Sequence, residues 1–312
     1  MKYKDKGIHH ISVISGDAQT NADFYVNKLG LRMVLKSVNQ DDPGTYHLFY
    51  ANAEGEPGSS ITFFPWKRAV RSKTGTGEVE RISFSVPVDS ISYWQKRFDD
   101  LDIPAGGPFE RFGRKVLPFE DPDGLTLEIV EDNRSKDLPG WKDADVPLDK
   151  AIRGFWGANL LLSQTEETAE ILTDILGFKR VEDSGNQTLY ETGSDLGHSV
   201  ILEKADVVQY GKTGRGTVHH LAFRTKDEEQ LQEFRQKVIS KGLSPTNIID
   251  RHVFKSVYFQ TPGGVLFEMA TDGPGYQSVA SSDEKMGQEL FLPNFLEPKR
   301  DIIEQRLEPI EV

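Results

Sequence analysis

The amino-acid sequence repeats one pattern along its length, and this repeat constrains the fold more than any other feature. The segment NADFYVNKLGLRMV (21–34) resembles TAEILTDILGFKRV (168–181), and both look helical. Further along, DPDGLTLEIVED (121–132) resembles TPGGVLFEMATD (261–272). Similarity at a fixed spacing is the signature of a repeated structural unit. The chain of 312 residues therefore contains two related halves of about 140 residues each.

Each half divides again into two quarters with the same order of elements. The first quarter predicts a strand, a helix and three further strands, at 8–15, 19–29, 31–38, 45–51 and 60–65. The second quarter predicts the same order, at 79–86, 89–100, around 109–119 and 125–130. Glycine and proline clusters separate the strands, as turns require. The sequence thus predicts an α+β fold built from four βαβββ modules.

The modules also predict a division into domains. We expect a first domain over 1–132, a second over 151–272 and a tail over 273–312. The segment 133–150 is polar, contains prolines and predicts the linker between the two domains. Within the tail, DIIEQRLEPI predicts a short closing helix, and LFLPNF predicts an apolar anchor to the body of the protein.

Two pairs of adjacent histidines open strands at matching points of the chain. His9 and His10 begin the first strand, and His219 and His220 begin a strand of the fourth module, whose last strand carries Glu268. Two imidazoles and one carboxylate on separate strands form a set that suits Fe(II) and O2 chemistry when coordination positions stay open. Because the chain has only seven histidines, two matching pairs indicate a shared function.

Composition excludes several other kinds of site. The formal net charge of −12 disfavours nucleic acid or an anionic membrane surface as a partner. The chain has no cysteine, so disulfides, thiolate metal sites and a cysteine nucleophile are excluded. No apolar run reaches the roughly 18 residues that span a bilayer, and the start, MKYKDKGIHH, lacks the apolar core of a signal peptide. We therefore expect a cytoplasmic protein.

The four modules, with their histidines and the glutamate of the last strand, resemble the vicinal oxygen chelate superfamily over about residues 7–272. Members of that superfamily include glyoxalase I, bleomycin-binding proteins and extradiol ring-cleaving dioxygenases. The resemblance implies that two modules pair so that their curved, mixed sheets surround one metal ion. It also implies that the metal ligands lie on the first and last strands of the paired modules.

Modules 1 and 4 together supply three of these ligand positions. The resemblance assigns the metal ligands to His10, His220 and Glu268. Ile61 or Thr62 stands where glyoxalase-type members have a further carboxylate ligand. A set of three leaves positions for a substrate oxygen and for O2, which favours Fe(II), and the same donors also suit Mn(II).

Modules 2 and 3 lack such a set. Arg81 stands where module 4 has His220, and Gly157 stands where module 1 has His10. The remaining acid, Glu128, is expected to face a guanidinium or to pair at the surface. We therefore expect this second pairing to be an inactive copy of the first.

Neighbouring side chains of a regular strand point to opposite faces, so only one histidine of each pair can bind the metal. The resemblance implies that it is the second, because His10 stands seven residues before Asp17, as in related proteins, and His220 is its analogue. His9 and His219 are then candidates to act beside the ligands. The remaining histidines are expected to be incidental and exposed, namely His47, His198 and His252.

Within the superfamily, the chain most resembles the hydroquinone-type ring-cleaving dioxygenases. Those proteins share the doubled histidines and the use of ligands from the first and fourth modules. Arg251 and Tyr258 match the family spacing, and Ser12 stands where relatives have threonine. The resemblance implies Fe(II)-dependent insertion of both atoms of O2 into a hydroquinone, which opens the ring beside a hydroxyl-bearing carbon. The implied partners are thus a small aromatic substrate and O2.

The same resemblance suggests roles for the residues around the metal. Arg251 would stabilise developing negative charge, and His9 or His219 would accept the phenolic proton. Tyr258 would donate a hydrogen bond or cover the ring. Strand alternation alone would place Arg251 and Tyr258 on opposite faces, so we expect a turn or bulge at 254–256.

Other functions on the same scaffold stay open at this stage. A catechol extradiol dioxygenase is one alternative, and a glyoxalase-like isomerase is another, although the isomerase needs a fourth protein ligand or a mobile base. A bleomycin-type binding protein without catalysis is an alternative of a different class. Quinone detoxification or the catabolism of aromatic hydrocarbons follows only from the resemblance, and a homo-oligomer is compatible with the sequence.

Overall fold

The structure is a computed structural model that describes residues 6–312. Residues 1–5 lie outside the described residues. They begin the N-terminal segment in which we expect no signal peptide. From residue 6 onward, no helix is both long enough and apolar enough to cross a membrane.

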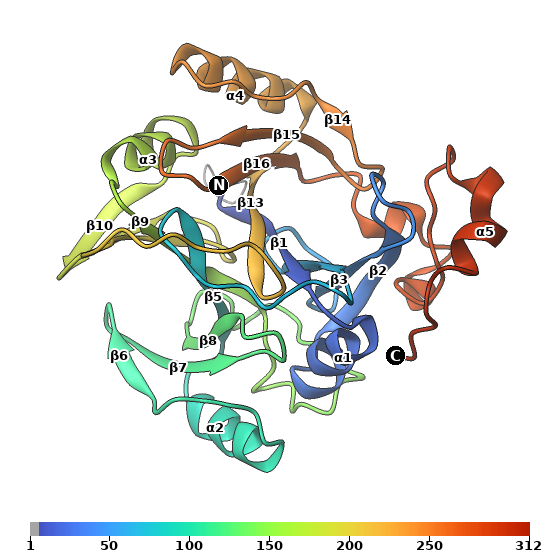
Figure 1. Ribbon diagram of the computed structural model, residues 1–312. Helices are drawn as coiled ribbons and strands as arrows, with labels where there is room; N and C mark the ends of the chain where they lie inside the picture. Colours follow the sequence, from blue (N-terminus) through green and yellow to red (C-terminus); the bar gives the residue numbers. More distant parts are fainter. Residues whose placement is uncertain (1–5) are drawn as a thin grey trace.

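The first sheet combines modules 1 and 4 (Figure 1). Module 1 comprises β1 (Ile8–Ser15), α1 (Ala18–Ala22), η1 (Asp23–Lys28), β2 (Arg32–Val38), β3 (Tyr46–Ala51) and β4 (Ser60–Pro65). Module 4 comprises β13 (Thr217–Thr225), α4 (Glu228–Ser240), β14 (Ile249–Asp250), β15 (Lys255–Gln260) and β16 (Leu266–Thr271). The strand order is β14-β15-β16-β13-β1-β4-β3-β2.

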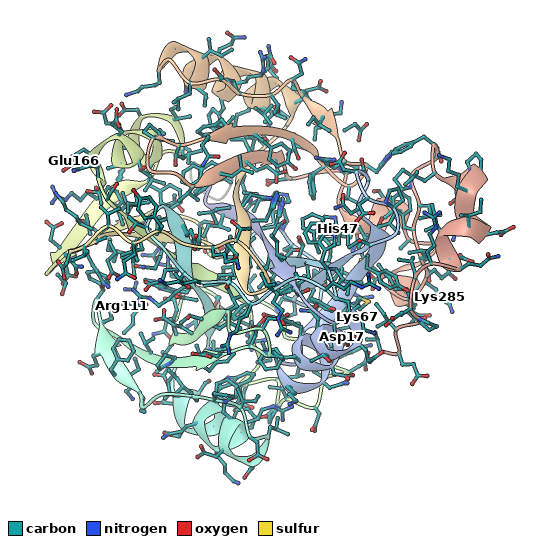
Figure 2. All side chains as sticks on the ribbon, in the orientation of Figure 1. Asp17, His47, Lys67, Arg111, Glu166 and Lys285 are labelled. Atoms are coloured by element: carbon teal, nitrogen blue, oxygen red, sulfur yellow. The ribbon has the colours of Figure 1, made fainter. Side chains whose placement is uncertain are left out.

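The second sheet combines modules 2 and 3. Module 2 comprises β5 (Glu78–Val86), α2 (Ile91–Asp100), β6 (Phe109–Arg111), β7 (Arg114–Glu120) and β8 (Thr126–Glu131). Module 3 comprises β9 (Gly154–Leu162), α3 (Glu166–Glu170), η2 (Ile171–Ile175), β10 (Lys179–Ser184), β11 (Gln187–Glu191) and β12 (Ser199–Lys204). The strand order is β10-β11-β12-β9-β5-β8-β7-β6. Figure 2 places Arg111 in this sheet and His47 in the first.

The predicted fold class and the predicted pairing of modules are confirmed. The strands expected around 109–119 are β6 and β7, which are separated by a turn at Phe112 and Gly113 with φ of 47° and 68°. The segment 133–150 contains no helix or strand, and its Val146 is buried in the core. The division of the chain into domains at this segment stays a prediction.

Two β-bulges interrupt the antiparallel pairing of β1 with β13. His9 is the extra residue of the bulge in β1, and His219 is the extra residue of the bulge in β13. A bulge bends its strand and redirects a side chain, so the alternation expected for a regular strand does not hold at either histidine pair. The pairs Ile8–Phe223 and His10–Ala222 flank the bulge at His9. The pairs Ser12–His220 and Val13–Val218 flank the bulge at His219.

The hydrophobic core lies between the sheets and the helices that cover them (Figure 1). Because side chains alternate along β1, Ile11 and Val13 enter the core. Ser12 faces the opposite side of the sheet, which we call the inner face. Asp17 caps the N-terminus of α1, because its carboxylate accepts a hydrogen bond from the Thr20 backbone nitrogen at 2.9 Å.

The C-terminal tail lies along the edge strand β2. It contains η3 (Tyr276–Val279), η4 (Asp283–Lys285), η5 (Glu297–Lys299) and α5 (Arg300–Glu304). The Phe291 backbone nitrogen donates to the Lys36 carbonyl at 2.9 Å. Leu292 and Leu296 pack with Val38 in a small apolar cluster. The predicted closing helix and apolar anchor are therefore confirmed.

We expect Phe63→Ala to lower the free energy of unfolding by about 3–5 kcal/mol, the usual cost of removing a buried aromatic ring. Phe63 is fully buried, and its ring centroid lies 4.5 Å from that of Tyr25. Phe295, which is 59% exposed, provides the matched control, and Phe295→Ala should change stability by less than about 0.5 kcal/mol. Equal losses in urea unfolding would contradict this assignment of the core.

Candidate metal centre

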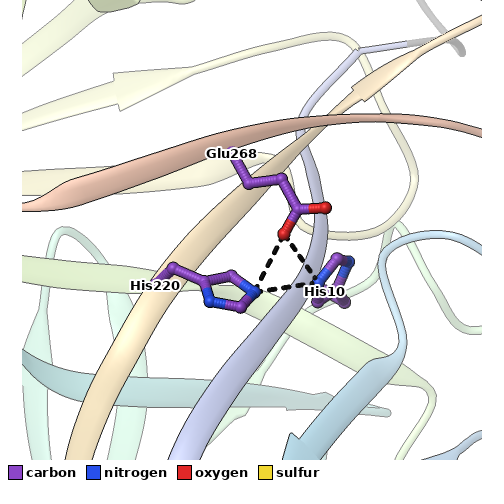
Figure 3. A group of neighbouring side chains, drawn as sticks. All are labelled: His10, His220 and Glu268. Atoms are coloured by element: carbon purple, nitrogen blue, oxygen red, sulfur yellow. Dashed lines mark hydrogen bonds and ion pairs between the residues drawn. The ribbon is translucent and has the colours of Figure 1, made fainter. Parts of the chain in front are cut away.

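Three ligand-type side chains from different strands meet on the inner face of the first sheet (Figure 3). His10 lies on β1, His220 on β13 and Glu268 on β16, and all three are buried. The Nε2 atoms of the two histidines are 3.3 Å apart. Glu268 Oε2 lies 3.2 Å from His10 Nε2 and 2.9 Å from His220 Nε2.

This spacing fits a divalent metal ion. Zinc, taken as a guide to first-row metals, binds imidazole nitrogen and carboxylate oxygen at about 2.0–2.2 Å. Donors at right angles around such an ion lie about 3 Å from one another, as the three atoms do here. Glu268 Oε2 is also buried and accepts no hydrogen bond from residues 6–312. A cation between the three atoms would satisfy it.

The charge of Glu268 is stabilised by its two neighbours. Burial alone would raise the pKa of this carboxyl, but the adjacent His10 and His220 outweigh burial and hold its pKa well below the usual range. Ser256 on β15 donates a hydrogen bond to the other carboxylate oxygen, Oε1. The carboxylate is therefore ionised and oriented, as a metal ligand must be.

The outer histidine of each pair holds the inner one. His9 Nδ1 lies 2.9 Å from His10 Nδ1, and His219 Nδ1 lies 2.7 Å from His220 Nδ1. For Nε2 of His10 or His220 to bind a metal as neutral imidazole, its Nδ1 must carry the proton and donate it to the outer ring. The outer ring then has its own proton on Nε2, so it acts as a donor at that atom.

The two outer histidines differ in exposure. His9 is buried, packs against Phe254 and does not line the cavity above the ligands. His219 is the more exposed of the two and does line that cavity. Desolvation, followed by the charge of His220, lowers the pKa of His219 to about 4, so its ring is neutral near pH 7. Of the two histidines predicted to act beside the metal ligands, only His219 lies where it can contact a molecule bound in the cavity.

A cavity of about 130 Å³ opens above the three ligand-type residues. Its aromatic walls come from both modules and the tail, and include Phe49, Phe64, Trp66, Phe254 and Phe291. Its polar lining includes His47, His219, Arg251 and Tyr258.

Arg251 and Tyr258 lie together at this cavity. The Arg251 guanidinium stands over the Tyr258 ring at 5.5 Å, and its Nη1 donates to Gln40 Oε1 at 3.5 Å. The turn that brings them to one side covers 251–254, with His252 at φ 71°, and precedes β15. The expected position of this turn, 254–256, is therefore wrong, since Lys255 and Ser256 already belong to the strand.

Ser12 does not line the cavity and is connected to it through Thr62 and His47. Its Oγ lies 2.7 Å from Thr62 Oγ1, which lies 3.0 Å from His47 Nε2. The prediction that His47 is exposed is wrong, because the alternation of β3 turns His47 and Phe49 to the inner face, where both line the cavity. That alternation was the signal in the sequence that could have identified His47.

His198 is also not an exposed, incidental residue. It is fully buried, and its Nε2 lies 3.0 Å from Asp132 Oδ2 while its Nδ1 lies 2.7 Å from Ser199 Oγ. It directly precedes β12 of the second sheet and does not line the cavity. His252 lies in the turn before β15, where its ring contacts Phe291.

The second sheet has no metal-binding set at the corresponding positions. Ser83 pairs with Gly157 there as Ala222 pairs with His10 in the first sheet. Glu128 occupies the position of Glu268, but Arg111 Nη1 donates to its Oε1 at 2.9 Å. As predicted, a guanidinium rather than a cation site faces this carboxylate.

A family model described as the Glyoxalase/Bleomycin resistance protein/Dioxygenase superfamily matches residues 7–129 and 158–269. The chain belongs to this superfamily. MhqO of Bacillus subtilis, provisionally named a ring-cleaving dioxygenase, is 43% identical over 312 residues, covering 100% of this chain and 99% of that protein. The chlorohydroquinone/hydroquinone 1,2-dioxygenase of Sphingobium indicum is 34% identical over 305 residues, covering 95% of this chain and 94% of that protein.

Solved structures show the same fold. A provisionally named dioxygenase from Bacillus subtilis superposes with a TM-score of 0.95 at 42% identity, covering 99% of each chain. Glyoxalase I from Zea mays superposes with a TM-score of 0.64 at 15% identity, covering 86% of this chain and 92% of that chain. The second similarity is one of fold alone.

We expect Glu268→Gln to weaken the binding of added Fe(II) or Mn(II) by more than about 100-fold, since loss of an outer partner alone typically costs about 10–100-fold. Glu128→Gln is the matched control, because Glu128 is the equivalent buried glutamate of the second sheet. It should leave metal affinity within about twofold, measured by calorimetry. Loss of metal binding in Glu128→Gln would show that the wrong pair of modules has been chosen.

Proposed function

We propose that this protein is a ring-cleaving dioxygenase that holds Fe(II) with His10, His220 and Glu268 and acts on hydroquinone-type aromatic diols. The observation that carries the proposal is the convergence of three ligand atoms, 2.9–3.3 Å apart, beneath a cavity with aromatic walls. The names of the similar proteins, a ring-cleaving dioxygenase and a chlorohydroquinone/hydroquinone 1,2-dioxygenase, support the same reaction class.

The number of ligands favours an oxygenase over an isomerase. Three protein donors leave coordination positions for a substrate oxygen and for O2. A glyoxalase-like isomerase would need a fourth ligand, and the strand register places Thr62 opposite Ser12 where Glu268 stands opposite Ala222. Thr62 offers a hydroxyl that is already engaged. The three donors also suit Mn(II) and therefore do not select Fe(II) by themselves. We propose Fe(II) because of its reactivity toward O2.

The cavity fits one aromatic ring. Its volume of about 130 Å³ is close to that of an engineered apolar cavity of about 150 Å³ that binds benzene. Phenylalanine rings on several sides favour a flat apolar body, and a few polar groups provide orientation. A single-ring diol meets both requirements.

The surrounding side chains orient the substrate and stabilise its charge. The two oxygens of a hydroquinone are para, so only one of them can reach the metal. When bound, iron supplies the electron exchange with O2 that ring opening requires. Arg251 donates hydrogen bonds to an oxygen that gains negative charge, and His219 donates from Nε2 to the same end of the ring. Burial and the nearby Glu268 raise the pKa of Tyr258, so its hydroxyl stays protonated and donates.

This assignment changes one predicted role. His9 or His219 was expected to accept the phenolic proton, but the contact between Nδ1 of His219 and Nδ1 of His220 favours the His219 tautomer that donates at Nε2. His9 acts behind His10 and holds its ring. On the resemblance to hydroquinone-type enzymes, we further propose a cytoplasmic role in quinone detoxification or in the catabolism of aromatic hydrocarbons.

After anaerobic reconstitution with Fe(II), we expect one O2 to be consumed per methylhydroquinone or chlorohydroquinone, faster than with catechol. An oxygen electrode and isotopic O2 would measure the uptake and the incorporation of both atoms. Faster uptake with catechol would replace hydroquinones by catechols as the substrate class. No uptake with any aromatic diol would reject the oxygenase, and tight drug binding without metal would favour a bleomycin-type binding protein.

We expect Arg251→Lys to lower kcat by about 100-fold with iron content unchanged, because a lysine cannot reproduce the planar donor fork at the substrate. Arg111 occupies the equivalent place in the second sheet and gives the control. Arg111→Lys should keep kcat within about twofold. Similar kcat values for the two variants would remove Arg251 from the site.

A further inference from the structure

His47 lies on the opposite side of the cavity from Arg251 and Tyr258. In the first sheet the ligand-type residues occupy the central strands β16, β13 and β1. Tyr258 belongs to β15 on one side of them, and His47 belongs to β3 on the other side. Figure 2 shows His47 on the β3 side of the sheet. The cavity therefore has a polar side chain on each flank of the metal-binding set.

The imidazole of His47 is held in one orientation. Its Nε2 lies 3.0 Å from Thr62 Oγ1, and Thr62 Oγ1 lies 2.7 Å from Ser12 Oγ. Both hydroxyl-bearing residues are fully buried. The ring centroids of Phe49 and Phe64 lie 4.0 and 4.1 Å from that of His47. Rotation of the ring would break the hydrogen bond and disturb both aromatic contacts.

The other nitrogen of this ring, Nδ1, has no hydrogen-bond partner within the described part of the chain. Two nearby polar groups that line the cavity are already engaged. Ser37 Oγ donates to the Phe291 carbonyl at 2.9 Å, and Trp66 Nε1 donates to Asp42 at 3.2 Å. On this flank, His47 thus combines a fixed ring with an uncommitted polar atom.

We propose that His47 binds the hydroxyl group of the aromatic diol that does not coordinate the metal, and that it thereby selects para-diols over monophenols. This inference rests on the proposed function. With one oxygen at the metal, the para hydroxyl points toward the far end of the cavity, where a buried hydroxyl without a partner would be costly. Because Thr62 can donate to or accept from Nε2, Nδ1 of His47 can accept from or donate to the substrate.

The test compares hydroquinone with phenol, which lacks the second hydroxyl. Dissociation constants are measured by calorimetry on the Fe(II)-loaded protein without O2, so that no turnover occurs. We expect His47→Phe to weaken hydroquinone binding about tenfold, the scale of one lost hydrogen bond. Phenol binding should stay within about twofold, because phenylalanine fits between the same aromatic rings.

A second variant separates hydrogen bonding from packing. In His47→Asn the amide nitrogen stands near the place of Nδ1, so this variant should recover most of the preference for hydroquinone over phenol. An unchanged preference in His47→Phe, or equal weakening of both compounds in both variants, would overturn the role of His47. Absence of O2 uptake by the wild type would overturn the proposed function, and absence of hydroquinone binding would overturn both.

Discussion

The antiparallel pairing of β1 with β13 is the contact on which the site depends. It joins the first module to the fourth and brings together His10 and His220, which are 210 residues apart in the chain. Neither module carries all three ligand-type residues, so the site exists only after the two ends of the repeat have met. Contacts of such long range form slowly. A metal ion that binds only the paired form would stabilise this contact by mass action.

Much of this arrangement could be predicted from the sequence. Period-two patterns and glycine-rich turns predicted the four modules, and the positions of Arg81 and Gly157 predicted which pair of modules lacks a site. In the structure, Arg111 is a third residue by which the second sheet differs from the first. A buried glutamate needs a positive partner, and in the second sheet a guanidinium provides it. In the first sheet, the equivalent Glu268 lies beside His10 and His220, and its Oε2 accepts no hydrogen bond from residues 6–312.

The features that the sequence did not predict arise from pairing between distant strands. Alternation within one strand separated His9 from His10, but the bulges that bring each pair of Nδ1 atoms into contact are a property of β1 and β13 together. The orientation of the His47 ring likewise depends on a residue of another strand, Thr62 of β4. The polarity of His47 alone favoured an exposed position. The sequence and its resemblance thus pointed to the three residues that converge, whereas the contacts of the side chains around them required three-dimensional neighbours.

The tail that lies along β2 both covers an edge of the first sheet and forms part of the cavity wall. Its backbone bonds to Lys36 and Ser37 cover a strand edge that would otherwise offer a template for another chain. Its Phe291 also closes part of the aromatic cavity. Substitutions in this segment would therefore affect both resistance to aggregation and the shape of the cavity, so change at this wall is constrained by the need to keep the edge of the sheet covered.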